Sequence, residues 1–337
     1  MKKFRVGLIG CGGRQQVHID ALLKMEDVEI VAVADPVEDR RLRAAAKTGA
    51  TGVYKDHTEL FDSVAEHPLD ALFIAVEPTA HHRIEERAIE LGIPFMVEKP
   101  MTLDLAQAEQ IAAMIKAKKL ITSVGFQDRY LDLMETVKAE LPKHPTGGLV
   151  YGAWIGNIPG VWWWQKKSTC GGQLLEQNIH LVDGLRFLFG EPLSVYAIAT
   201  RGMVTPGVDA SPEYDTDDHS VCLFRFPNQI TAALASGCYV TEVRPNCGLL
   251  ISLKDIVIDY RLRNNLILTS RHQTVDIKPR NNQSYDLDRN FLDAVRTGNA
   301  TLVRSPYDDA LKTLKVCFAA NRSMETGEVI YFGEEKA

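Results

Sequence analysis

The stretch that decides the fold stands at the start of the chain, where residues 4–15 are FRVGLIGCGGRQ. A short apolar run, Phe4–Ile9, leads directly into a segment with three glycines, and an amphipathic stretch of helical length follows at Gln15–Met25. The run is too short for a typical buried helix, whereas glycines permit a tight turn from a strand into a helix. The stretch therefore predicts a strand–turn–helix unit.

The same alternation continues to residue 124. Further strands are expected at Val28–Ala34, Ala71–Val76, Pro94–Val97 and Leu120–Val124, with a short one at Gly52–Tyr54. Helices are expected at Val37–Lys47, Thr79–Leu91 and Leu103–Lys118. Strands that alternate with helices form right-handed crossovers, so we expect an α/β fold with a doubly wound parallel sheet.

The pattern changes after about residue 125. Helical patterns are Asp128–Leu141, Gln173–Phe189, Leu287–Thr297 and Tyr307–Glu325. Strands are expected at Ser194–Thr200, Ser220–Phe226, Ile230–Gly237, Gly248–Ser252, Ile256–Tyr260, Leu266–Ser270, Thr274–Ile277 and near Val329–Phe332. Consecutive strands joined by short polar turns predict a mostly antiparallel sheet. The predicted domains are 1–124 and 125–337.

Composition narrows the class of protein. The 337 residues include 38 Lys and Arg against 44 Asp and Glu, a net charge of −6, which argues against nucleic acid or an anionic membrane as the main partner. No apolar run reaches the length of a membrane span, and the run after Met1 contains Arg5 and ends at Gly10, which predicts a strand rather than an export signal. The six scattered cysteines have no metal-type spacing, so we expect reduced thiols, no metal, and a cytoplasmic location.

The glycine segment stands in the context of a dinucleotide-binding turn. Glycines allow the backbone to approach a pyrophosphate, and the following helix offers free N–H groups at its N-terminus. Asp35 ends the second strand about twenty residues beyond Gln15, where a carboxylate accepts hydrogen bonds from the adenosine ribose. Gln15 replaces the third glycine of G-x-G-x-x-G, which is expected to loosen helix–strand packing. The expected contacts are Gly10, Cys11, Gly12, Gly13, Arg14, Gln15 and Asp35.

The cofactor expected at this turn is NAD rather than NADP. The Asp35 carboxylate repels a 2′-phosphate, unless Arg14 or Arg40 neutralises that phosphate. A tight strand–helix turn that binds no nucleotide is the alternative interpretation of the glycines.

Two further segments have residues suited to chemistry. Lys99 follows the fifth strand, and ligands of doubly wound sheets bind beyond the carboxyl ends of the strands, although a lysine there is usually just solvated. The helical pattern Gln173–Phe189 is heavily apolar yet has polar residues in its middle, which favours a site. Glu176 and His180 lie four residues apart, so Glu176 can orient the imidazole; a chance pair on an exposed helix is the alternative. Gln177 and Asn178 are candidate substrate contacts.

The four tryptophans lie within eleven residues, the last three at Trp162, Trp163 and Trp164. Aromatic rings stack on the apolar faces of sugars, and a neighbouring polar group such as Lys166 binds hydroxyls. A loop packed under the second domain, or an oligomer contact, is the alternative. Arg129 and Tyr130 are further candidates for the pocket lining, or plain surface residues.

Several segments in this order resemble the Gfo/Idh/MocA family, the glucose–fructose oxidoreductase and inositol dehydrogenase group. They are Gly10–Gly13 with His18, Ile74–Pro78 with His81, Glu98–Pro100, Val124–Gln127 with Arg129 and Tyr130, Gly171–His180 with Asp183, and Ala310–Thr326 followed by Val329. The resemblance spans nearly the whole chain, and it implies a Rossmann domain followed by an α/β domain whose large open sheet builds homodimers or homotetramers. The cofactor contacts it adds are Val76, Glu77, Pro78, His81, Glu98, Lys99 and Gln127.

The resemblance also implies reversible oxidation of a secondary alcohol on a sugar, inositol or derivative, with Lys99 and His180 as catalytic residues. On this hypothesis His180 takes the hydroxyl proton, Lys99 stabilises the developing alkoxide, and Glu176 orients and charge-stabilises His180. Glu176 stands where the family usually has Asp, which alters how His180 is held. The alternatives are a lyase, epimerase or glycosidase that acts through a transient keto-sugar, and a non-catalytic nicotinamide sensor.

Overall fold

A computed structural model describes residues 3–243, 245 and 247–333 of the chain. It divides into two compact units: the first runs to Tyr130 and includes Asn282–Leu311, and the second comprises Leu131–Asn281 and the chain from Lys312 onward. The predicted division at residue 124 differs from these units, because 282–311 packs with the first unit. The predicted domain ends at residues 1 and 337 lie outside the described residues.

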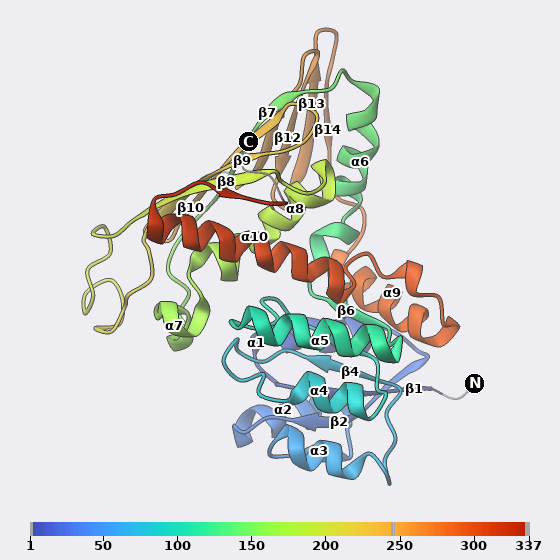
Figure 1. Ribbon diagram of the computed structural model, residues 1–337. Coiled ribbons are helices and arrows are strands. Elements are labelled where there is room, and N and C mark those ends of the chain that lie inside the picture. The colour runs from blue at the N-terminus through green and yellow to red at the C-terminus, as the bar shows by residue number, and fades with distance from the viewer. Residues whose placement is uncertain (1–2, 244, 246, 334–337) are drawn as a thin grey trace. The chain divides into compact units, whose positions relative to one another are not determined.

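The first unit is built on a six-stranded parallel sheet with the order β3-β2-β1-β4-β5-β6 (Figure 1). Its strands are β1 (Phe4–Ile9), β2 (Val28–Ala34), β3 (Gly52–Tyr54), β4 (Ala71–Ile74), β5 (Phe95–Val97) and β6 (Thr122–Val124). The order turns back at β1 and β4, whose carboxyl ends therefore flank the crevice where such sheets bind ligands. This sheet confirms the predicted doubly wound fold.

Helices cover both faces of this sheet. They are α1 (Gly13–Leu22), α2 (Glu38–Thr48), α3 (His57–Ser63), α4 (Ile84–Glu90), α5 (Leu105–Lys118), the 3-10 turn η1 (Gln127–Tyr130), α9 (Gln283–Thr297) and η5 (Ala300–Leu302). Helices α3, α4 and α5 lie next to one another on one face (Figure 1). Helices α1 and α9 pack together on the other, where Ile19 and Phe291 join a core with the strand residues Val6 and Phe73. Helix α9 therefore belongs to the first unit, although it lies far from the other helices of this unit in the sequence.

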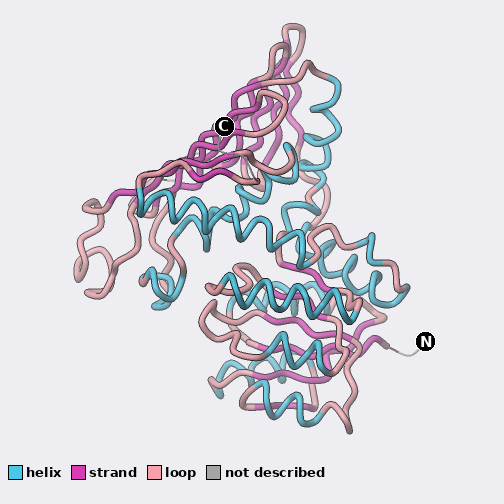
Figure 2. Tube along the Cα trace, viewed as in Figure 1, coloured by secondary structure: helices cyan, strands magenta, loops and turns pink. Residues whose placement is uncertain are grey.

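The second unit contains a nine-stranded, mostly antiparallel sheet, as predicted, with the order β14-β13-β12-β11-β7-β10-β9-β8-β15. Its strands, magenta in Figure 2, are β7 (Gly148–Ile155), β8 (Ser194–Thr200), β9 (His219–Arg225), β10 (Ile230–Gly237), β11 (Gly248–Ser252), β12 (Ile256–Arg261), β13 (Asn265–Ser270), β14 (Thr274–Ile277) and β15 (Ile330–Tyr331). Strand β7, which the sequence patterns did not predict, pairs in parallel with β10 and antiparallel with β11 near the middle of the sheet.

The helical elements of this unit are α6 (Asp132–Glu140), η2 (Leu141–Lys143), η3 (Trp162–Gln165), α7 (Lys167–Cys170), the π-helical turn η4 (Leu174–Asn178), α8 (Ile179–Phe189) and most of α10 (Tyr307–Thr326). Thr313 of α10 donates a hydrogen bond from Oγ1 to Asp183 of α8 at 2.7 Å, and Gly184 of α8 lies next to the Met134 side chain of α6. These contacts gather α6, α8 and α10 on one face of the sheet. Among the described residues, no helix is long and apolar enough to cross a membrane.

Candidate active site

The glycine turn of the first unit leaves space for a ligand next to the N-terminus of α1. Gly10 has φ of 83°, and a Cβ there would lie 2.3 Å from the carbonyl oxygen of Ala75, so only glycine fits. At Gly12 and Gly13, in contrast, a Cβ would meet nothing within 4 Å. Gly12 caps α1 without a side-chain hydrogen bond, which leaves backbone N–H groups of the first turn to an outside acceptor such as phosphate.

Gln15 provides an independent test of whether a polar ligand fits here. Its side chain in the first turn of α1 is fully buried, and neither the amide nitrogen nor the amide oxygen has a hydrogen-bond partner. A buried primary amide without partners is costly, so such groups normally meet a water or a ligand. The orphaned amide and the open glycines together fit the phosphates of a dinucleotide.

Asp35 lies at the end of β2 and fixes the glycine turn. Its Oδ2 accepts a hydrogen bond from the backbone N–H of Cys11 at 2.7 Å, and its Oδ1 accepts one from Val37 at 2.8 Å. Each carboxylate oxygen keeps a further lone pair for a ribose hydroxyl. Burial and the Asp35 charge raise the pKa of the Cys11 thiol to about 12, although the Arg40 charge acts in the opposite direction. This thiol is therefore neutral.

The two arginines that were expected to decide between NAD and NADP differ in their surroundings. Arg14 donates from Nε to Glu98 at 2.6 Å and from Nη2 to Gln127 at 3.3 Å. Its guanidinium therefore neutralises a carboxylate of the protein, whereas the side chain of Arg40 is exposed.

Glu98, directly after β5, lies where the predicted cofactor residues of this unit converge. Besides Arg14, its carboxylate contacts His18 Nε2 at 3.1 Å and accepts the backbone N–H of Lys99 at 3.2 Å. A Cβ at Gly125 would lie 2.5 Å from Glu98 Oε1, so the glycine after β6 makes room for this carboxylate. The glycine turn, the Glu98-Lys99 dipeptide and the segment after β6 thus meet at one edge of the sheet.

The segment after β4 holds the other expected cofactor contacts. Val76 and Glu77 are partly exposed, and Pro78 is buried. His81 is also buried, and its Nδ1 is engaged by the carboxylate of Glu85 in a short hydrogen bond.

In the second unit, an unusual backbone precedes the candidate imidazole. Gly171 and Gly172 both have positive φ, 78° and 91°, and the chain then forms the π-helical turn η4 before α8 begins. The Nε2 of Gln173 donates to the carbonyl oxygen of Gly237 at 2.7 Å, which anchors this turn to β10. Such π-helical turns are frequent at functional sites, and this one presents His180 one residue into α8.

His180 packs in a stack of three side chains. Its ring lies on the indole of Trp154 from β7, with centroids 6.0 Å apart and planes 24° apart. The guanidinium of Arg263, in the turn between β12 and β13, lies 5.5 Å from the Trp154 ring centroid. The imidazole is 5 % exposed. Trp154 and Arg263 were not predicted as site residues, and only a three-dimensional contact reveals them.

Glu176 is held by a tryptophan. Trp164 donates from its indole Nε1 to Glu176 Oε2 at 2.8 Å. Because the turn around Glu176 is π-helical, the expected spacing of an α-helix between Glu176 and His180 does not apply there.

Three of the predicted substrate contacts are buried and packed or bonded within the protein. Trp164 is 1 % exposed within an apolar cluster with Val204 and Tyr214, so it has no free face for a sugar. Asn178 is fully buried and donates to the carbonyl oxygen of Ala235. Arg129 belongs to the first unit, where its buried guanidinium binds the carbonyl oxygen of Arg304 and the carboxylate of Asp309.

The other candidate substrate contacts are accessible to different degrees. Trp162 is 64 % exposed, and Trp163 and Gln177 are partly exposed. Lys166 forms an ion pair with Glu213. Tyr130, in the first unit, is buried and its hydroxyl accepts the backbone N–H of Arg304.

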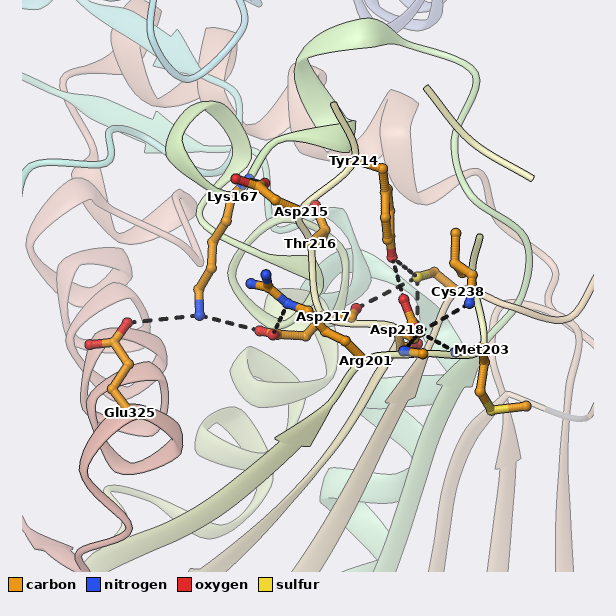
Figure 3. A network of polar contacts seen from close by, with 12 residues as sticks. Lys167, Arg201, Met203, Tyr214, Asp215, Thr216, Asp217, Asp218, Cys238 and Glu325 are labelled. Atoms are coloured by element: carbon orange, nitrogen blue, oxygen red, sulfur yellow. Dashed lines mark hydrogen bonds and ion pairs between the residues drawn. The ribbon is translucent and has the colours of Figure 1, made fainter. Parts of the chain in front are cut away.

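A polar network holds the loops around this part of the second unit (Figure 3). The buried carboxylate of Asp218 accepts three backbone N–H groups at 2.6–3.1 Å, from Gly202, Met203 and Val204, and the hydroxyl of Tyr214 at 3.0 Å. Burial acts against this arrangement, but the hydrogen bonds lower the pKa of Asp218 overall. The network fixes the loop whose side chains enclose Trp164.

Relatives among known proteins agree with the fold and the motifs. The chain is 25% identical over 207 residues to the rhizopine catabolism protein MocA of Rhizobium meliloti, which covers 59% of this chain and 62% of that protein. It is 23% identical to scyllo-inositol 2-dehydrogenase (NAD(+)) of Bacillus subtilis, over 99% of this chain and 97% of the relative. An oxidoreductase from Agrobacterium radiobacter, solved with NAD+, L-tartaric acid and magnesium, has the same fold, with a TM-score of 0.82, 20% identity and 98% of each chain covered.

Family models match most of the chain. The oxidoreductase family with an NAD-binding Rossmann fold matches residues 4–126, and the GFO/IDH/MocA C-terminal domain matches residues 149–250. The chain belongs to the Gfo/Idh/MocA family of NAD-binding oxidoreductases.

Proposed function

We propose that this protein is an NAD-dependent dehydrogenase that oxidises, reversibly, a secondary hydroxyl of a sugar, an inositol or a related polyol. The observation that carries the proposal is the imidazole of His180, buried against Trp154 at a π-helical turn in a chain of this family. The relative from Bacillus subtilis, named as an inositol dehydrogenase and matched over almost the whole chain, supports the substrate class.

In the proposed mechanism, bound NAD supplies the hydride acceptor, and the protein handles the proton. His180 removes the proton from the substrate hydroxyl during oxidation and returns it during reduction, a role for which an imidazole is suited because it can accept and release a proton. The ammonium of Lys99 donates a hydrogen bond to the same oxygen and stabilises its developing negative charge. Glu176, held by the Trp164 indole, stabilises the charged form of His180.

The cofactor residues of this proposal lie in the first unit. The N–H groups at the start of α1 and the amide of Gln15 bind the phosphates, and Asp35 binds the ribose. The Asp35 carboxylate also repels a 2′-phosphate, and the Arg14 charge is already paired with Glu98. Further contacts are proposed for Cys11, Val76, Glu77, Pro78, His81, Lys99 and Gln127.

The proposed substrate contacts are those predicted side chains that remain accessible. Trp162 and Trp163 provide ring faces, and Lys166 and Gln177 provide polar groups for hydroxyls. Free cysteines at all six positions agree with a reducing compartment such as the cytoplasm, which we propose as the location.

We propose further that the open face of the nine-stranded sheet binds a second copy of the chain. Leu223 of β9, Ala233 of β10, Tyr151 of β7 and Leu250 of β11 stand opposite one another in register, and form one row across four strands. Leu223, Tyr151 and Leu250 are 47, 52 and 38 % exposed, an apolar area unusual for a monomer. Light scattering is expected to show a dimer or tetramer that Leu223→Glu dissociates; a wild-type monomer would reject this proposal.

An absorbance assay for NADH tests the catalytic proposal. NAD and NADP are offered separately with inositols, sugars, glycosides and sugar acids, and Lys99→Ala is compared with Lys119→Ala, an exchange at a surface lysine. Reduction of NAD by one class of substrate, lost only in Lys99→Ala, is expected. Silence with every substrate, in protein that binds NAD, would instead favour transient oxidation within a lyase or epimerase, or a sensor.

A further inference from the structure

A row of charged side chains connects α9, α1 and the segment after β5 in the first unit. The Nδ1 of His18 in α1 lies 2.9 Å from both carboxylate oxygens of Asp288 in α9, and its Nε2 lies 3.1 Å from Glu98 Oε1. Glu98 binds Arg14 Nε at 2.6 Å. His18 and Asp288 are both fully buried, so water does not screen these contacts. Both imidazole nitrogens face carboxylates, an arrangement that favours the imidazolium.

Glu98 connects these charged side chains to the backbone of Lys99 and to the start of α1. Its Oε2 accepts the N–H of Lys99, and its Oε1 binds both His18 and Arg14, which lies in the first turn after the glycines. Gly125 packs directly against the Glu98 carboxylate, because a Cβ at this position would overlap it. Because these contacts hold the Glu98 carboxylate from several sides, they also fix the positions of Lys99 and of the glycine turn.

The groups that face His18 make its charge state predictable. Burial alone lowers the pKa of His18, but the Asp288 charge and the hydrogen bonds to Asp288 and Glu98 outweigh burial and the opposing Arg14, and the pKa rises to about 9. The Glu98 pKa falls to about 2, since Arg14, His18 and Lys99 overcome the effect of burial. The ring of Phe73, whose centroid lies 5.6 Å from that of the imidazole, is uncharged.

We propose that Asp288 and His18 are positioning residues, which hold Glu98 and, through it, Lys99 and the glycine turn in the arrangement required for NAD binding and hydride transfer. The inference rests on the proposed function, because Lys99 acts there on the substrate oxygen. It assigns a role in the cofactor half of the molecule to Asp288, a residue some 190 positions further along the chain than Lys99. Without the Asp288 charge, burial favours the neutral imidazole, so the positive charge beside Glu98 is lost and Asp288 no longer fixes which imidazole nitrogen carries the proton.

The variant Asp288→Asn tests this, with Asp286→Asn in the same helix as control and Asp288→Glu as the conservative exchange. We expect Asp288→Asn to lower kcat/KM by about 10²-fold at pH 8.5, the scale of a misplaced catalytic group, and by much less at pH 6, where the imidazolium still forms. Asp288→Glu is expected to restore activity at both pH values. A merely structural role predicts the same loss at both, and that result would overturn the inference.

Two further measurements test the inference if no substrate is turned over or if Asp288→Asn fails to fold. The dissociation constant of NAD, from isothermal titration calorimetry, is expected to show the same pH-dependent difference between wild type and variant. If every polyol is inert but this difference appears, the proposed function fails and the inference stands. Proton NMR of wild-type imidazoles, with His144→Ala to remove a surface imidazole of raised pKa, is expected to show one histidine with a midpoint near 9; midpoints all near 6.5 would reject it.

Discussion

The two candidate half-sites differ in what holds their functional side chains. In the first unit, charged groups around Glu98 hold Lys99 and the glycine turn, with Arg14 and His18 as cationic partners. In the second, aromatic rings hold His180 and Glu176: Trp154 stacks on the imidazole, and Trp164 donates to the carboxylate. Charged contacts depend on pH and on exact partners, whereas stacking depends on shape.

Because of this difference, we expect substitutions in the two half-sites to lower activity with different pH dependence. Exchange of a charged partner in the first unit changes the protonation of its neighbours, so the damage varies with pH. Loss of a ring in the second unit removes packing and neither adds nor removes a charge, so we expect the damage to be nearly the same at all pH values. The four predictions below use this contrast.

The largest effect is expected for His180→Asn. Loss of a general base typically lowers turnover by about 10²–10⁴-fold, because the group that accepts the proton is removed. NAD affinity is expected to stay unchanged, since the cofactor residues belong to the first unit. Steady-state kinetics and isothermal titration calorimetry with NAD measure the two quantities. Unchanged turnover would remove His180 from the mechanism.

Trp154→Leu is expected to lower kcat by about 10²-fold, because the imidazole loses the surface that orients it. Trp154→Phe keeps a ring face, and we expect it to retain most of the activity. Neither exchange is expected to alter the shape of the pH profile of kcat, in contrast to Asp288→Asn. A profile displaced in Trp154→Leu would show that the ring acts on the imidazole electrostatically and would weaken the comparison.

Local pattern predicted the six strands of the first unit but missed helix α3, and it failed at particular places in the second unit. The glycine turn, Asp35 and the parallel strands follow from neighbouring residues, since each strand–helix unit is formed by contiguous sequence. Strand β7 was missed because its glycines are typical of loops, yet Gly152 packs closely in the sheet: a Cβ there would lie 2.7 Å from the Leu234 side chain of the paired strand. Only the paired strand reveals that contact.

Long-range contacts account for the remaining differences. Helix α9 was predicted as a helix, but its packing against α1 depends on residues far away in sequence, among them the pair Asp288 and His18. The π-helical turn before His180 has no signal in apolar periodicity. The tryptophan cluster suggested a sugar platform, and the structure separates it into an exposed ring, Trp162, and a buried one, Trp164.

The stability of the first unit is expected to depend on pH through His18. Its pKa in the folded protein, about 9, exceeds the ordinary value of 6.5, so the stabilisation is complete below pH 6.5 and is lost as pH rises through 9. The free energy of unfolding should fall by on the order of 2–3 kcal/mol across this window. Urea denaturation at several pH values measures it, and Asp288→Asn should flatten the slope. An equal slope in both proteins would contradict the assignment.

The smallest effect is expected for Trp162→Ala. A stacking contact on an exposed ring contributes about 0.5–1.5 kcal/mol, which raises the KM for substrate by about 2-fold to 10-fold and leaves kcat unchanged, because binding is lost equally in the ground and transition states. Trp164→Phe is the matched exchange: it keeps the buried ring but removes the N–H that holds Glu176, so kcat should fall while KM changes little. If Trp162→Ala lowers kcat and Trp164→Phe does not, the aromatic contacts of the second unit act on the substrate and not on the catalytic side chains, and the contrast between the two half-sites is withdrawn.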